Sequence, residues 1–61
     1  MKTIRQIIEE GAILTFSGRK RNVSDMVAYM AGYLENTGYT HDAVVVLDAI
    51  LDAARDGIIE W

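Results

Sequence analysis

The chain has 61 residues, a formal net charge of −3 and a hydrophobic content of 51%. This length predicts one small domain covering residues 1–61, whose core buries only about 60% of the surface that the unfolded chain exposes. Because the sequence has no cysteine, a disulfide framework and a thiolate metal site are excluded. The hydrophobic content excludes intrinsic disorder. Because a thin core gives little stability, we expect the chain to gain further stability by self-association.

A first helix is predicted to begin after Thr3, whose side chain can cap its first turn. Three apolar residues keep the helical spacing: Ile4, Ile7 and Ile8. The end of this helix has two solutions. Gly11 can end it, with residues 12–16 as a short β-like run, or the helix continues to Ser17 and Gly18 caps it.

Each solution has a physical cost, so both stay open. Ending the helix at Gly11 places Glu9 and Glu10 at a helix C-terminus, where the helix dipole disfavours negative charge. Continuing the helix instead places Ile13 and Phe16 on its polar side.

A second helix is predicted over residues 23–37, since Asn22 with Asp25 resembles a capping box and Gly38 can end the helix. Its apolar stripe and flanks are Val23, Met26, Val27, Met30 and Leu34, with Tyr29, Tyr33 and Ala31 beside them. The resulting apolar arc spans about 200°, which is wider than one packing partner needs. This excess predicts a subunit or partner interface.

The candidate interface residues are Met26, Tyr29, Met30 and Tyr33. Core packing is the competing interpretation, and it suits the two methionines best. We expect the tyrosines to contact a partner, because tyrosine is enriched at protein interfaces.

A third helix is predicted after Thr40, which can cap it, with Asp42 in the first turn. About half of its circumference is apolar: Ala43, Val44, Val46, Leu47, Ile50, Leu51, Ala53 and Ala54. Gly57 ends it, and residues 58–61 are apolar and β-prone. The short connection at Gly38 predicts an antiparallel hairpin of the second and third helices. Leu47 and Ile50 are expected in its core.

The expected fold class is therefore mainly α, a small three-helix domain that dimerises. An alternative rests on the order helix, short β-run, helix, helix, followed by Leu47-x-x-Ile50-Leu51 and Asp56-Gly57-Ile58-Ile59-Glu60. This pattern resembles a winged-helix domain as far as its second strand. The resemblance implies an α+β fold with short strands near 12–16 and 58–61, and DNA binding by the third helix.

Two departures count against DNA binding. The helix in the recognition position has four acidic residues and one arginine: Asp42, Asp48, Asp52, Asp56 and Arg55. Such a helix repels phosphates. The sequence also stops at Trp61, where a wing would still have to return. If the architecture holds, we expect a protein-binding derivative.

Charge divides the chain into two parts. Residues 1–22 carry five cations and two acids, a net charge of +3, whereas residues 23–61 carry one cation and seven acids, a net charge of −6. The basic run Arg19, Lys20 and Arg21 is a candidate anion-binding site beside a helix N-terminus. The competing interpretation is a solvated turn whose charges pair with acids of the chain: Glu9, Glu10 or Asp25.

Neither a metal site nor catalysis is expected. His41 and Asp48 are seven residues apart, about 10 Å along a helix, so one ion cannot bridge them, and Asp48 with Asp52 offers only two carboxylates. Ser17 and Ser24 have no evident histidine partner. We therefore expect no enzyme and no cofactor.

No apolar run reaches the roughly 18–20 residues that span a bilayer, and the N-terminus lacks a secretory apolar region. A cytoplasmic location without membrane contact is expected. The sequence thus predicts a noncatalytic interaction or regulatory module, a homodimer whose acidic third helix can receive a basic protein. The alternative is a module that contacts the phosphates of nucleic acid through residues 19–21. Nucleic acid is the less expected partner.

Overall fold

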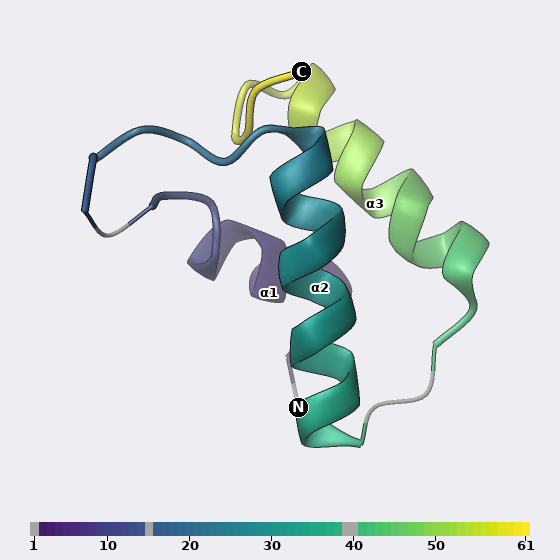
Figure 1. Ribbon diagram of the computed structural model, residues 1–61. Helices are drawn as coiled ribbons and strands as arrows, with labels where there is room; N and C mark the ends of the chain where they lie inside the picture. The colour runs from purple at the N-terminus through teal and green to yellow at the C-terminus, as the bar shows by residue number, and fades with distance from the viewer. Residues whose placement is uncertain (1, 15, 39–40) are drawn as a thin grey trace.

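The structure is a computed structural model that describes residues 2–14, 16–38 and 41–61. In these ranges the chain forms three helices, α1 (Ile4–Glu10), α2 (Val23–Thr37) and α3 (Ala43–Arg55). α2 and α3 run in opposite directions, and α1 packs against both of them (Figure 1). The predicted mainly α, three-helix fold with an antiparallel helical hairpin is confirmed.

α1 begins as predicted and ends at the earlier of the two predicted positions. The Thr3 hydroxyl accepts a hydrogen bond from the Gln6 N–H at 3.1 Å, and the Gln6 side chain accepts one from the Thr3 N–H at 2.8 Å. At the other end, the Gly11 N–H donates to the Ile7 carbonyl at 3.1 Å. The longer helix, capped by Gly18, is wrong.

Ion pairs offset the cost of acidic residues at the C-terminus of α1. The Glu10 carboxylate lies 2.7 Å from the Lys2 ammonium, and the Glu9 carboxylate lies 3.5 Å from Arg5 Nε. Nearby cations reduce the unfavourable interaction of these carboxylates with the helix dipole. Although such exposed pairs are weak, they allow the helix to end at Glu10.

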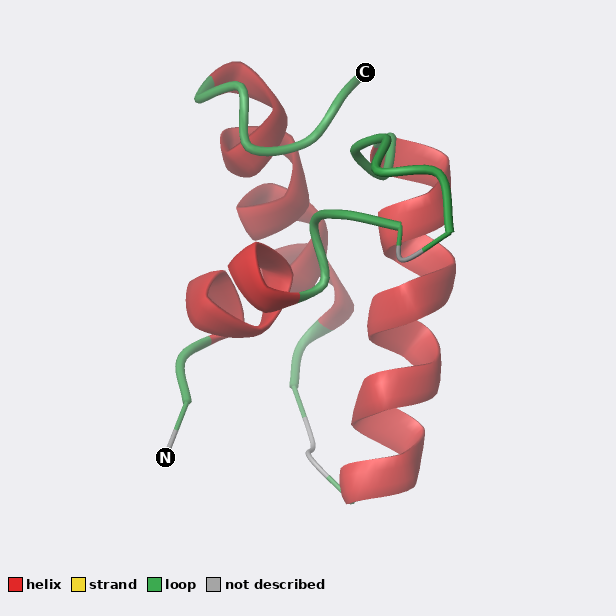
Figure 2. Cartoon of the chain, turned by 90° about the vertical axis from the view of Figure 1, so that its left-hand side faces the viewer, coloured by secondary structure: helices red, strands yellow, loops and turns green. Residues whose placement is uncertain are grey.

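Residues 12–14 and 16–21 belong to a hairpin-like segment, here called the arm, that projects from the helices (Figures 1 and 2). Ile13 and Lys20 form an isolated antiparallel bridge, and the Leu14 N–H donates to the Arg19 carbonyl at 2.8 Å. Gly18 has a φ of 67°, which glycine adopts without strain in the turn. Thr15 lies outside the described residues.

The winged-helix alternative is wrong for the part of the chain that the structure describes. Where strands were expected, the backbone makes only isolated bridges, Ile13 with Lys20 and Asn22 with Glu60. The end of the chain does return to the arm, because the Glu60 N–H donates to the Arg21 carbonyl at 2.9 Å. This contact fixes the C-terminal segment beside the start of α2.

The caps of the two longer helices follow the sequence closely, with one correction. Asn22 Oδ1 accepts from the Asp25 N–H at 2.7 Å, and Gly38 ends α2 with a φ of 72°. α3 is capped by Asp42, whose Oδ1 accepts from the Val44 N–H at 2.8 Å. The predicted cap, Thr40, lies outside the described residues, and placing Asp42 within the first turn was wrong. Aspartate is itself a preferred cap.

The core lies where the three helices meet. Its buried members are Ile7, Ile8, Ala12, Met26, Met30, Val46, Ile50, Ala53, Ala54 and Ile59. Ile50 is buried as predicted, with a relative accessibility of 1%, but Leu47 reaches 44%. The prediction for Leu47 is wrong because packing buries the stripe through Val46, Ile50 and Ala53, and Leu47 lies at its margin.

Candidate interaction surface

An open groove lies between α2 and α3, with a volume of about 280 Å³ and mostly apolar walls. Met30 and Ile50 form its buried floor, while Ala31 and Leu47 lie on its exposed walls. Val27, Leu34, Ala43 and Val46 complete most of the lining, and His41 also borders it. An apolar hollow of this kind, with side chains exposed at its edge, is typical of an interaction site.

The apolar surface continues from this α2/α3 groove onto α3. Val44, with a relative accessibility of 64%, precedes Leu47 by one helical turn, and Val45 is also exposed. Three large exposed hydrophobic residues on a helix of 13 residues is a high density for a solvated face. Exposed apolar surface therefore lies at the groove and on α3, whereas the sequence predicts it on the second helix.

The methionines of the predicted interface are part of the core. Met26 and Met30 have relative accessibilities of 0% and 1%, so their side chains present no surface to a partner. The interface prediction is wrong for these two residues, and core packing is the correct interpretation. Met30 reaches the groove only as part of its floor.

The tyrosines are half-buried and pack against the core rather than standing out from it. The rings of Tyr29 and Tyr33 stack with their centroids 6.2 Å apart. Tyr29 also lies against Gly11, where an added Cβ would come within 2.5 Å of Tyr29 Cζ. This side of α2 is therefore largely covered within the chain, which removes much of the surface expected for a partner.

Two of the three cations in the basic run bind backbone carbonyls at helix ends. Arg21 Nη1 donates to the Gly11 carbonyl at 2.5 Å, and its guanidinium lies 4.4 Å from the centroid of the Tyr29 ring. Lys20 Nζ donates to the Gly57 carbonyl at 2.6 Å. Both carbonyls lie just beyond helix C-termini, where positive charge is favourable.

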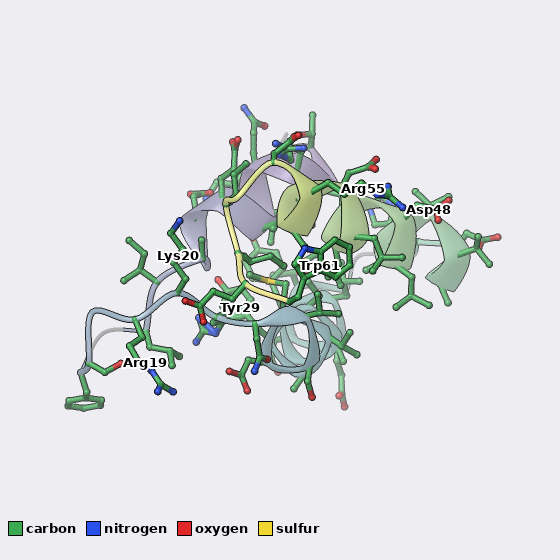
Figure 3. The ribbon with its side chains drawn as sticks, turned by 90° about the horizontal axis from the view of Figure 1, so that it is seen from above. Arg19, Lys20, Tyr29, Asp48, Arg55 and Trp61 are labelled. Atoms are coloured by element: carbon green, nitrogen blue, oxygen red, sulfur yellow. The ribbon has the colours of Figure 1, made fainter. Side chains whose placement is uncertain are left out.

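The predicted anion-binding site is therefore divided. Arg19 is exposed on the outer part of the arm (Figure 3), whereas hydrogen bonds from Lys20 and Arg21 connect the arm to the ends of the helices. The competing interpretation, in which these cations pair with acidic side chains, did not predict the carbonyl partners either. Periodicity and charge counting do not reveal backbone acceptors, so the sequence carried no clear signal for these contacts.

This geometry predicts different effects for two arginines that are only two positions apart. Arg21→Ala should lower the free energy of unfolding by about 1–2 kcal/mol, because a charged hydrogen bond and a ring contact are lost. Arg19→Ala should change it by less than about 0.5 kcal/mol. Thermal unfolding of both variants, followed by circular dichroism, tests this. Equal melting temperatures for the two would contradict the structural role of Arg21.

Part of the charge asymmetry is neutralised inside the chain. Arg5 Nη2 lies 2.7 Å from Asp56 Oδ2, which joins α1 to the end of α3. This hydrogen bond raises the pKa of Arg5, as the bond to Glu10 raises the pKa of Lys2. On α3, Asp52 pairs with Arg55, and Asp48 is exposed on the same helix (Figure 3).

The other candidate sites offer weaker support for ligand binding. A hollow of about 380 Å³ along α1 is lined by Lys2, Gln6, Glu9 and Glu10, whose charges already form exposed pairs. Among the described residues, no group of three histidine, cysteine or acidic side chains could hold a metal ion.

Comparison with family models, curated proteins and solved structures gives no match for this chain. No helix within the described ranges has the length and apolar character to cross a membrane.

Proposed function

We propose that the protein is a noncatalytic interaction or regulatory module that acts as a homodimer, with the α2/α3 groove at the subunit interface. The observation that supports this most is the exposed apolar surface formed by the groove and the adjoining face of α3. A chain of 61 residues has a thin core, and pairing two copies would bury this surface.

The subunit interface, or seam, proposed from the fold differs from the one that the sequence predicts. It uses the exposed walls of the groove, chiefly Val27, Ala31 and Leu47, in place of the buried methionines. The exposed carboxylate of Asp48 on α3 supports a basic protein as a further partner. A reducing cytoplasm is the proposed location, which a chain without cysteine suits.

Nucleic acid is not the partner we propose. Lys20 and Arg21 already donate to backbone carbonyls, so a phosphate would have to compete with these bonds for two of the three cations of the run. Neutralising several phosphates is what gives proteins useful affinity for nucleic acid. Replacing all three cations would also disturb the fold, so that triple variant is a poor test of binding.

Sedimentation equilibrium tests the proposed dimer. At tens of micromolar, the parent chain should have an average mass clearly above the 6.8 kDa of one copy. Ala31→Lys should shift the chain to the monomer, because it places a long charged side chain in the apolar groove. Ala28→Lys is the matched control, since Ala28 is exposed on the same helix and does not line the groove.

A parent chain of 6.8 kDa over the whole concentration range would refute the dimer. Equal loss of mass in the two lysine variants would refute the position of the interface, because only one of them alters the groove.

A further inference from the structure

We infer that the arm of one copy docks in the α2/α3 groove of a second copy, with Phe16 as its anchor. This inference rests on the proposed homodimer and names the contact that forms it. Two copies exchanging arms would make two identical contacts related by a two-fold axis, which is the commonest arrangement of soluble dimers.

The first observation is the exposure of Phe16. Its relative accessibility is 105%, so the ring contacts almost nothing in its own chain. Ile13, on the same arm, is also exposed. A phenylalanine covers about 150–250 Å² when it becomes buried, which makes a fully exposed ring a natural anchor for a partner.

The second observation is that the arm is held in a defined position. The Arg21 N–H donates to the Ala12 carbonyl at 2.6 Å, and the Gly18 N–H donates to the Leu14 carbonyl at 3.1 Å. At the base of the arm, Lys20 and Arg21 connect it to the helices. An anchor on a pre-organised segment loses less conformational entropy on binding than one on a loose loop.

The arm cannot fill the groove of its own chain. In Figures 1 and 3 the arm extends away from α3, and in Figure 1 the two lie on opposite sides of α2. The groove opens between α2 and α3. A second copy is therefore the occupant that brings this arm and this groove together.

The groove suits an aromatic ring. Its volume is about 280 Å³, and alanines on its walls, Ala31 and Ala43, leave room for a ring between larger side chains.

Charge complementarity supports the same pairing. The arm carries the exposed cation Arg19, close in sequence to Phe16. The two helices that form the groove carry more acids than cations: Asp25 and Glu35 on α2, and Asp48 and Asp52 with Arg55 on α3. Docking would bring arms of net positive charge to helices of net negative charge, and opposite charges attract.

A mixing experiment tests the exchange. Phe16→Ala removes the anchor and keeps the groove, whereas Ala31→Lys blocks the groove and keeps the arm. Each variant alone should have a dissociation constant raised about tenfold or more over that of the parent. An equimolar mixture of the two should recover association, because one intact arm then meets one intact groove. In the control mixture, Ala28→Lys takes the place of Ala31→Lys, so that the added lysine lies outside the groove.

Thermal unfolding of the separate variants checks that each is folded, which we expect because the substituted positions are exposed. If Phe16→Ala self-associates as tightly as the parent while Ala31→Lys does not, the groove is the seam but the arm is not its occupant. That result, or a mixture that associates no better than its components, overturns the inference and leaves the proposed dimer standing. A monomeric parent overturns both.

Discussion

Ile50→Ala is expected to lower the free energy of unfolding by about 2–5 kcal/mol, the range seen when a large buried side chain is truncated. Ile50 is almost wholly buried and lies in the core formed by all three helices. A chain of this size has a total stability of about 5 kcal/mol, so the change would unfold a large fraction of the molecules.

Leu47→Ala is the comparison for this result, because Leu47 lies one turn earlier on the same helix and is 44% exposed. Truncating it should cost less than half as much, since less apolar surface is lost. Urea titrations at one protein concentration give both values and keep any contribution from dimerisation the same. If Leu47→Ala is the more damaging change, the assignment of the buried face of α3 is wrong.

The local parts of the fold were predictable from the sequence. Thr3 and Asn22 can satisfy the first amides of a helix, and Gly38 adopts the left-handed conformation that ends one, so the structure confirms these boundaries. The start of α3 was harder because two good caps, Thr40 and Asp42, lie two positions apart, and local propensity does not choose between them.

The side of each helix that becomes covered was less predictable. Helical periodicity identifies an apolar arc, but which part of it stays exposed depends on the crossing of the helices. On α3 this leaves Leu47 at the edge of the groove, and on α2 it buries Met26. Tyr29 is covered because Gly11 lacks a side chain, a contact between residues 18 positions apart that no periodic pattern contains.

The basic run illustrates a different limit. Its three cations are equivalent in sequence, yet Arg21 and Lys20 bind carbonyls while Arg19 stays exposed. Backbone acceptors exist at every helix C-terminus, so composition alone does not show which cation reaches them. The apolar groove, whose walls come from two helices, is therefore a stronger candidate site than the basic run.

Gly11→Ala is expected to lower the free energy of unfolding by about 1–3 kcal/mol, through overpacking. Its φ of −92° is ordinary, so the cost comes from the close approach of the Tyr29 ring and not from backbone strain. The ring cannot easily move aside, because it also contacts the Arg21 guanidinium and stacks on Tyr33.

Gly32→Ala is the control for the Gly11 substitution. Gly32 lies within α2 and an added Cβ would meet nothing within 4 Å, so alanine there should stabilise the helix by about 0.5–1 kcal/mol. A double-mutant cycle then identifies the cause of the Gly11 effect. In a Tyr29→Ala background the clash is absent, and Gly11→Ala should cost less than about 0.5 kcal/mol. An undiminished cost in that background would show that Tyr29 is not what requires glycine at this position, and that the covered side of α2 has been wrongly assigned.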